Sequence, residues 1–280
     1  MQKISYYNGI IRPTSELVIP LSDRAVFFGD GVYDMAVGRG GKIFRAEEHI
    51  ERFFRSARAI GIINRQSPDD LLEILCTVAR KSGFPEYSIY MQMSRSSKTR
   101  VHSYLGSHGV NLLVSADECS VPRRLEKIKL ITAEDKRYYY CNVKTINLLP
   151  AVLASSEAEE SGCDEAVLVR GGFVTECAHS NISILSGGVL YTHPDCELIL
   201  PGITKKHLLF AAGAIGIKCV EMPFRVGDML SADEVIVTST TKQMRVATEI
   251  DGVSVGGRAP DFLDSLFGRL ISEYEEEMEK

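Results

Sequence analysis

The amino-acid sequence predicts a two-domain protein of mixed α+β and α/β class. At 280 residues, the chain is long enough for one large domain or two modest ones. Segments with strand periodicity alternate with amphipathic helical segments along the chain. A polar stretch that contains Pro122, residues 118–124, is the best candidate for a linker. We therefore expect a smaller α+β domain over residues 1–120 and a larger α/β domain over residues 121–280.

Local signals predict the elements of the first domain. Asn8-Gly9 between apolar residues predicts a β-hairpin. A short helix that carries Tyr33 is expected after the glycine-punctuated segment Phe28-Gly-Asp-Gly31. Apolar residues at helical spacing, and acidic residues in a first turn, predict helices at 47–60 and 68–81. Strands are expected at 42–44, 87–93 and 110–115, with a polar loop between the last two.

The second domain is predicted to mix strands and helices. Ile182-Ser-Ile-Leu185 alternates apolar and polar residues, and Gly187-Gly188 turns the chain into a second strand. Strands are expected at 128–132, 142–144, 182–185, 189–192, 218–222 and 234–238, and helices at 148–160, 203–213 and 262–280.

Composition argues against several classes of protein. The net charge of −5, from 32 basic and 37 acidic residues, argues weakly against a nucleic-acid partner. We find no apolar run long enough to span a bilayer and no signal-peptide core, so a cytoplasmic location is expected. The seven cysteines are scattered and are expected to be free thiols, and no metal-type spacing is found.

The segment 175–204 predicts a site for a ligand that carries both a basic ring and an anion. It opens with an acid, Glu176, among small and polar residues. Pro201-Gly202 bends the backbone before the predicted helix at 203–213. The start of that helix offers free N–H groups and the positive end of the helix dipole, which suit a phosphate. An acid and an anion site together can hold a pyridine ring that carries a phosphate.

A cofactor of this kind also needs a lysine that forms an imine, and Lys144 is the candidate. It lies in the otherwise uncharged run Cys141-Asn-Val-Lys-Thr-Ile-Asn-Leu-Leu149. Apolar neighbours indicate partial desolvation, which favours the neutral, nucleophilic amine. On residue type alone, a strand-end lysine with its ammonium group in water is the commoner arrangement.

These residues carry a resemblance to a known family. Glu176, Asn181, Thr192, Ile203 and Lys205 have the spacing of the fold-type IV pyridoxal-phosphate signature. The chain resembles that family along nearly its whole length and is most similar to its bacterial D-amino acid (D-alanine) aminotransferases. The other segments that carry the resemblance are Phe28-Gly-Asp-Gly-Val-Tyr33, Glu48-His-Ile-Glu-Arg52, Val143-Lys-Thr-Ile-Asn-Leu-Leu149, Leu190-Tyr-Thr-His-Pro194 and Val237-Thr-Ser-Thr-Thr241.

The resemblance implies pyridoxal 5′-phosphate as cofactor and a role for each matching residue. Lys144 would hold the cofactor as an internal aldimine and then move the proton at the substrate Cα. Glu176 would pair with the pyridine nitrogen. Without the resemblance, Arg52 would be placed on a solvated helix face. The remaining cofactor contacts that it implies are Arg52, Leu200, Ile203, Thr204, Ser239, Thr240 and Thr241.

The resemblance also implies a site for the substrate carboxylate. Arg100 and His102 match an Arg-x-His pair that, with a tyrosine matching Tyr33, grips the α-carboxylate in D-amino acid aminotransferases. That pair reaches in from the partner subunit, which implies a homodimer. Tyr90 completes the predicted substrate contacts. The residues alone would place Arg100 and His102 in a charged surface loop.

The expected reaction is transamination of a D-amino acid, with D-alanine as leading donor and a 2-oxo acid such as 2-oxoglutarate as acceptor. Three alternatives within the family are open: an aminodeoxychorismate lyase, a branched-chain aminotransferase and an (R)-amine transaminase. Cys177-Ala-His-Ser180 departs from the glycine and serines of D-amino acid aminotransferases. The role of His179 and the preferred side chain therefore stay open.

Overall fold

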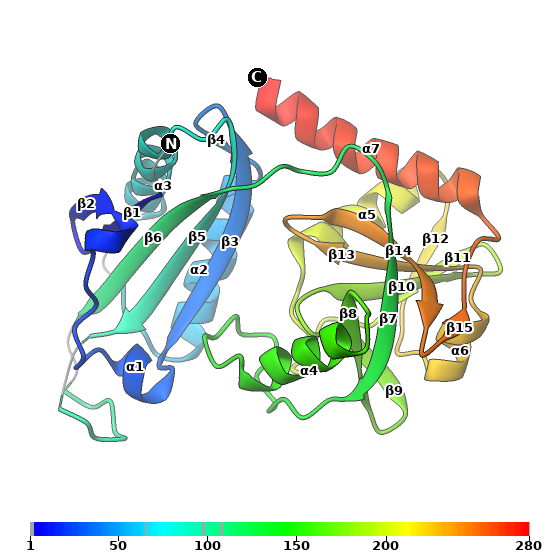
Figure 1. Cartoon of the computed structure of the whole chain (residues 1–280), viewed down its shortest axis with the longest axis horizontal. Helices are drawn as coiled ribbons and strands as arrows, with labels where there is room; N and C mark the ends of the chain where they lie inside the picture. The colour runs from blue at the N-terminus through cyan, green and yellow to red at the C-terminus, as the bar shows by residue number, and fades with distance from the viewer. Residues whose placement is uncertain (1–2, 65, 97–98, 107–108, 280) are drawn as a thin grey trace. The chain divides into compact units, whose positions relative to one another are not determined.

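A computed structural model of the chain describes residues 3–64, 66–96, 99–106 and 109–279 (Figure 1). The chain forms two compact units. Unit 1 contains Met1–Val121, Val143–Asn147 and Glu277–Lys280, and unit 2 contains Pro122–Asn142 and Leu148–Glu276. The first change of unit therefore falls inside the predicted linker. A contiguous division at residue 120 leaves out the two later segments that pack in unit 1.

The described part of unit 1 contains an antiparallel sheet of six strands in the order β2-β1-β6-β5-β3-β4. Two amphipathic helices, α2 and α3, pack against it. A reciprocal pair of hydrogen bonds between Ser67 and Asp70 caps the start of α3. The elements are β1 (Ile4–Tyr7), β2 (Ile10–Pro13), η1 (Thr14–Glu16), α1 (Arg24–Phe28), β3 (Gly31–Arg39), β4 (Lys42–Ile43), α2 (Ala46–Ala59), α3 (Pro68–Ser82), β5 (Glu86–Arg95) and β6 (Val110–Glu118).

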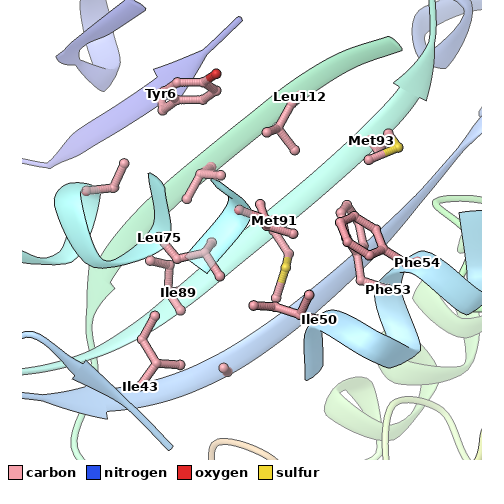
Figure 2. Packing of buried hydrophobic residues seen from close by; sticks show 14 of the residues in the cluster. Tyr6, Ile43, Ile50, Phe53, Phe54, Leu75, Ile89, Met91, Met93 and Leu112 are labelled. Carbon is pink, nitrogen blue, oxygen red and sulfur yellow. The ribbon is translucent and has the colours of Figure 1, made fainter. Parts of the chain in front are cut away.

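The core of unit 1 lies between this sheet and its two helices. Figure 2 shows Ile50 and Phe53 of α2, and Leu75 of α3, beside Ile89 and Met91 of β5. All five side chains are buried. This packing fixes α2, and α2 in turn carries Arg52 and His49 on the buried side of the helix.

The described residues of unit 2 form a mixed sheet of nine strands. Eight run in the order β12-β11-β10-β13-β14-β7-β8-β9, and the ninth, β15, pairs with β14. The elements are β7 (Glu126–Glu134), α4 (Leu149–Glu160), β8 (Glu165–Arg170), β9 (Phe173–Cys177), β10 (Asn181–Ser186), β11 (Val189–Thr192), α5 (Ile203–Ala214), β12 (Lys218–Glu221), α6 (Val226–Ser231), β13 (Glu234–Ser239), β14 (Gln243–Ile250), β15 (Val253–Ser254) and α7 (Pro260–Glu279).

The sheet of unit 2 brings three chain segments to one place. Asn181, at the start of β10, pairs with Thr238, near the end of β13. The side chain of Asn181 donates to the carbonyl of Leu200, which precedes α5, at 2.9 Å. Helix α5 itself packs on β13. The start of α5, the start of β10 and the end of β13 therefore converge.

The mixed α/β class is confirmed, but two predicted elements are wrong. Tyr33 lies on strand β3, and the short helix α1 comes before it instead of after it. Gly29 ends α1 in the left-handed conformation, with φ of 60°. Residues 142–144 form no strand, and the next residue, Thr145, makes an isolated bridge to Val32. Within the described residues, no helix is long and apolar enough to cross a membrane.

Candidate active site

Lys144 lies on the segment of unit 1 that runs beside β3. The backbone N–H of Tyr33 donates to the Lys144 carbonyl at 2.9 Å, and the Lys144 N–H donates to the Ser56 hydroxyl at 3.2 Å. The side chain is half-buried, and its Nζ lies 4.4 Å from the centre of the Tyr33 ring. Strand β3 and helix α2 thus fix the backbone of this lysine and direct its amine over an aromatic face.

Tyr33 and Tyr90 form an aromatic pair beside Lys144. Their rings are stacked with centres 5.5 Å apart, on the neighbouring strands β3 and β5. The Tyr90 hydroxyl donates to the side-chain oxygen of Gln92 at 2.7 Å. Burial, with a smaller contribution from Tyr33, raises the pKa of Tyr90 above its ordinary value. A tyrosine hydroxyl can donate one hydrogen bond to a carboxylate, and Tyr90 would have to release Gln92 to do so.

Arg52 lies in a buried cluster of charged and titratable side chains. It donates to both carboxylate oxygens of Asp34, at 2.7 and 2.8 Å, and His49 Nδ1 lies 2.8 Å from Asp34 Oδ1. Burial opposes ionisation of Asp34, but Arg52 outweighs it and holds the pKa of that carboxyl below its usual range. The sequence did not predict a role for Asp34 or His49, because Asp34 meets His49 and Arg52 only in the folded chain, 15 and 18 positions away.

Arg100 and His102 lie on a separate loop of unit 1. Residues 99–106 between β5 and β6 are exposed, and we call this segment the clamp loop. The Arg100 guanidinium lies 5.4 Å from the centre of the Phe28 ring, and the His102 ring centre is 5.3 Å from that of Phe28. The two predicted carboxylate ligands are therefore neighbours, and they face one aromatic side chain at the end of α1.

Glu176 lies in unit 2 at the end of β9 and is buried. One carboxylate oxygen accepts from Arg137. The other accepts from the Asn181 amide at 2.9 Å and from the backbone N–H of Leu200 at 3.1 Å. An adjacent guanidinium and several donors favour the ionised carboxylate. The group can therefore pair with a protonated ring nitrogen.

Arg137 is the main site residue that the sequence prediction missed. It also donates to Asp135 at 2.9 Å and to the Leu198 carbonyl at 3.0 Å. Burial opposes its charge, but Asp135 and Glu176 raise the pKa of the guanidinium above its ordinary value. Its role depends on Glu176, 39 positions away. The only local signal was an Asp-x-Arg pair after a strand.

The start of α5 and the turn after β13 are the segments where the sequence predicts an anion site. Among the described residues, no side chain caps the helix at Gly202. A Cβ atom on Gly202 would lie 1.8 Å from the Asn181 side-chain oxygen, so any larger residue would have to displace Asn181. Asn181 pairs with Thr238, so the end of β13, which leads into Ser239, lies next to the strand that contacts this helix start. The predicted cofactor contacts on these segments are Leu200, Ile203, Thr204, Ser239, Thr240 and Thr241.

His179 lies outside the network around Glu176. Its side chain is 55% exposed, and its Nδ1 lies 3.1 Å from Glu165. Glu165 is fully buried and paired with Arg245 and Ser180. The structure thus gives His179 a place at the edge of a buried ion pair.

Each unit therefore collects part of the predicted site. Unit 1 brings together Lys144, Tyr33, Tyr90 and Arg52, with Arg100 and His102 on the clamp loop. Unit 2 brings together Glu176 and the residues at the start of α5. An amine, a buried ionised carboxylate and helix amides without a side-chain cap are the groups that pyridoxal 5′-phosphate requires, for its aldehyde, ring nitrogen and phosphate respectively. The residues present fit that cofactor.

Comparison with known proteins agrees with this chemistry. A D-alanine aminotransferase of Listeria monocytogenes is 36% identical over 252 residues, which cover 88% of this chain and 87% of that protein. A D-alanine aminotransferase of Bacillus licheniformis is 34% identical over 264 residues, with 91% and 90% covered.

Solved structures share the fold at lower identity. A branched-chain aminotransferase of Thermoproteus uzoniensis has a TM-score of 0.89 at 24% identity and covers 98% of this chain and 97% of its own. A candidate 4-amino-4-deoxychorismate lyase of Legionella pneumophila has a TM-score of 0.84 at 24% identity, with 93% and 97% covered. Residues 31–250 match the family model for amino-transferase class IV. The chain therefore belongs to the class IV aminotransferases, which are transaminases that depend on pyridoxal 5′-phosphate.

Proposed function

We propose that this chain transfers the amino group of a D-amino acid, with D-alanine as the leading donor, to a 2-oxo acid such as 2-oxoglutarate. The main support is that the chain is 36% and 34% identical in sequence to two proteins named D-alanine aminotransferase, in each case over most of its length. Solved relatives with other activities share the fold at 24% identity. Their lower identity makes the branched-chain and lyase activities weaker candidates.

Lys144 is the proposed catalytic base and acid. Bound pyridoxal 5′-phosphate supplies an electron-withdrawing ring that stabilises negative charge at the substrate Cα. The Lys144 amine would take the proton from the substrate Cα and deliver it to the C4′ carbon of the cofactor, so that the donor leaves as a 2-oxo acid. Its backbone bonds to Tyr33 and Ser56 support this role, because a proton-transfer group needs a fixed position.

Glu176 and the start of α5 are the proposed holders of the ring and the phosphate. The contact between Arg137 and Glu176 supports an ionised carboxylate that keeps the ring nitrogen protonated. The backbone N–H groups of Ile203 and Thr204 would donate to the phosphate, together with the segment 239–241. Arg52 is proposed as a further phosphate ligand because of the family resemblance. Since it already pairs with Asp34, it would have to bind the Asp34 carboxylate and the phosphate together.

Arg100 and His102 are the proposed ligands of the substrate carboxylate, reaching a neighbouring subunit of a homodimer. Both residues are exposed on the single chain. The same loop exposes three apolar side chains, Val101, Tyr104 and Leu105. Exposed apolar residues beside a functional pair support burial against a second copy of the chain. Tyr33 would add a single donor to the arginine fork.

A single-turnover experiment tests the proposed reaction. Protein loaded with pyridoxal 5′-phosphate is mixed, without an acceptor, with D-alanine, L-alanine or L-leucine. We expect the visible absorption of the bound cofactor to disappear with D-alanine alone. A response to L-leucine alone would indicate a branched-chain enzyme, and no response to any of the three would favour the lyase or amine activities.

Arg100→Ala tests the carboxylate clamp. Loss of a charged, two-pronged contact should lower kcat/KM for D-alanine about 10- to 100-fold. The rate with (R)-1-phenylethylamine, which has no carboxylate, should change less than threefold or so. Equal losses of activity on both substrates would show that Arg100 does not bind the substrate carboxylate.

Size-exclusion chromatography with light scattering tests the dimer.

A further inference from the structure

One buried arginine holds the backbone of the clamp loop. Arg24, at the start of α1, is only 3% exposed. Its two terminal nitrogens donate to the carbonyls of Val101 at 2.7 Å and His102 at 2.9 Å. Its Nε donates to Asp30 at 2.7 Å. The guanidinium therefore joins two consecutive carbonyls of the loop to the carboxylate of Asp30.

A second buried arginine extends the same network. Arg95 is 6% exposed, and its Nε donates to both oxygens of Asp30 at 2.9 and 3.2 Å. Its terminal nitrogens donate to the carbonyls of Ile60 and Gly61, at 2.6 and 2.8 Å. The guanidinium carbon lies 4.0 Å from the centre of the Tyr104 ring. Asp30 thus joins Arg24 to an arginine that is itself fixed by the end of α2 and touches the same loop.

The positions of the bonded carbonyls determine which part of the loop is fixed. Two carbonyls bonded to one planar guanidinium define the orientation of the peptide between Val101 and His102. That orientation sets the direction in which the His102 side chain leaves the backbone. Phe28, one turn after Arg24, contacts both groups: its ring centre is 4.7 Å from the Arg24 guanidinium carbon and 5.3 Å from the centre of the His102 ring.

We propose that Arg24 is a positioning residue for the substrate carboxylate, because it holds the Arg100–His102 segment in its binding geometry. The inference rests on the proposed D-amino acid transamination and on the proposed clamp. Loop residues 99–106 are exposed, so without Arg24 the segment would have to be ordered at each binding event. A lysine at position 24 could reach one partner but could not join all three.

The first test is kinetic. Arg24→Lys should raise KM for D-alanine and for 2-oxoglutarate about tenfold or more, with kcat changed less than KM. Its single-turnover rate with (R)-1-phenylethylamine should stay within about twofold of wild type, because that amine needs no carboxylate ligand. The matched control is Arg39→Lys, at the end of β3 in the same unit, whose side chain is 30% exposed and lies 3.9 Å from Glu86. The control should match wild type with both substrates.

The second test measures the loop directly. Hydrogen exchange of a peptide that covers residues 99–106 should be about tenfold faster in Arg24→Lys than in wild type, and unchanged in Arg39→Lys. If Arg24→Lys does not fold, Asp30→Asn weakens the same anchor and should give a smaller effect with the same selectivity. Unchanged exchange, or equal losses with D-alanine and the amine, would overturn the proposal. A wild-type protein inactive on D-alanine would instead contradict the proposed function, while exchange would still test the anchor.

Discussion

Arg137 donates a hydrogen bond to the carboxylate of Glu176, and both side chains are largely buried in unit 2. The guanidinium is held in turn by Asp135, whose carboxylate is fully buried. These contacts belong to the folded chain itself, so they favour the ionised form of Glu176 without any ligand. The carboxylate proposed to pair with the cofactor ring nitrogen is therefore ionised before any ligand binds.

Replacing Arg137 should therefore impair catalysis. Arg137→Gln removes the charge beside Glu176, so the buried carboxylate becomes easier to protonate and pairs less well with the ring nitrogen. A lost charged hydrogen bond corresponds to about 1.5–3 kcal/mol, so kcat with D-alanine should fall roughly 10- to 100-fold. Steady-state kinetics with Arg258→Gln as control, an arginine that is 59% exposed, checks this. Wild-type kcat in Arg137→Gln would contradict the role.

Gly202 should be essential for space at the start of α5. Its φ of −72° is open to any residue, but an alanine Cβ would lie 1.8 Å from the Asn181 oxygen. Gly202→Ala must displace Asn181 or the helix start, and should weaken cofactor binding about tenfold or more. The measurement is a dissociation constant by fluorescence titration. Unchanged affinity would show that the helix start does not bind the phosphate.

Gly213 in the same helix provides the matched control. Apart from the adjacent helix backbone, no heavy atom of the described residues lies within 4 Å of a Cβ at this position, which is within the helix. Gly213→Ala should leave cofactor affinity unchanged and raise the free energy of unfolding by about 0.5–1 kcal/mol, because alanine favours the helix. Urea denaturation measures that difference.

Local signals in the sequence predicted the elements that depend on neighbouring residues. The turn at Asn8-Gly9, the helix after Pro68 and the helix after Gly202 are all confirmed. Tyr33 was placed on a helix because glycines precede it. Its strand is fixed instead by pairing with β5 along nine residues of each strand, a contact that is invisible in the local sequence.

For the candidate site, the family resemblance singled out individual positions, such as Lys144 and Glu176, whose roles stay predictions. The residues that support them were not predicted, because their partners are remote in sequence. Arg137 lies 39 positions from Glu176, and Arg24 lies 77 positions from Val101. A buried arginine is recognised only when the fold shows which carbonyl or carboxylate it meets.

The buried pair of Arg52 and Asp34 should make a large contribution to stability. Asp34→Asn removes the charge that neutralises a guanidinium only 4% exposed, so the free energy of unfolding should fall by about 3–5 kcal/mol. The control, Asp117→Asn, breaks the exposed bridge to Lys3, and should cost less than about 1 kcal/mol. Urea denaturation of both variants checks this. A loss below 1 kcal/mol in Asp34→Asn would contradict the argument.

His49 should make the protein less stable as the pH falls from 7.5 to 5.5. Burial lowers its pKa in the folded state, Asp34 opposes that effect, and the charges of Arg52 and Lys144 add to it. The unfolded chain binds a proton near its ordinary pKa of about 6.5, while folded His49 resists it. Each pH unit below that value therefore costs up to about 1.4 kcal/mol, until the folded pKa is reached.

His49→Asn removes this titrating group, so the free energy of unfolding of the variant should vary less with pH than that of wild type. Urea denaturation at pH 7.5, 6.5 and 5.5 measures both slopes, and equal slopes would show that His49 takes up its proton as readily in the folded protein as in the unfolded chain.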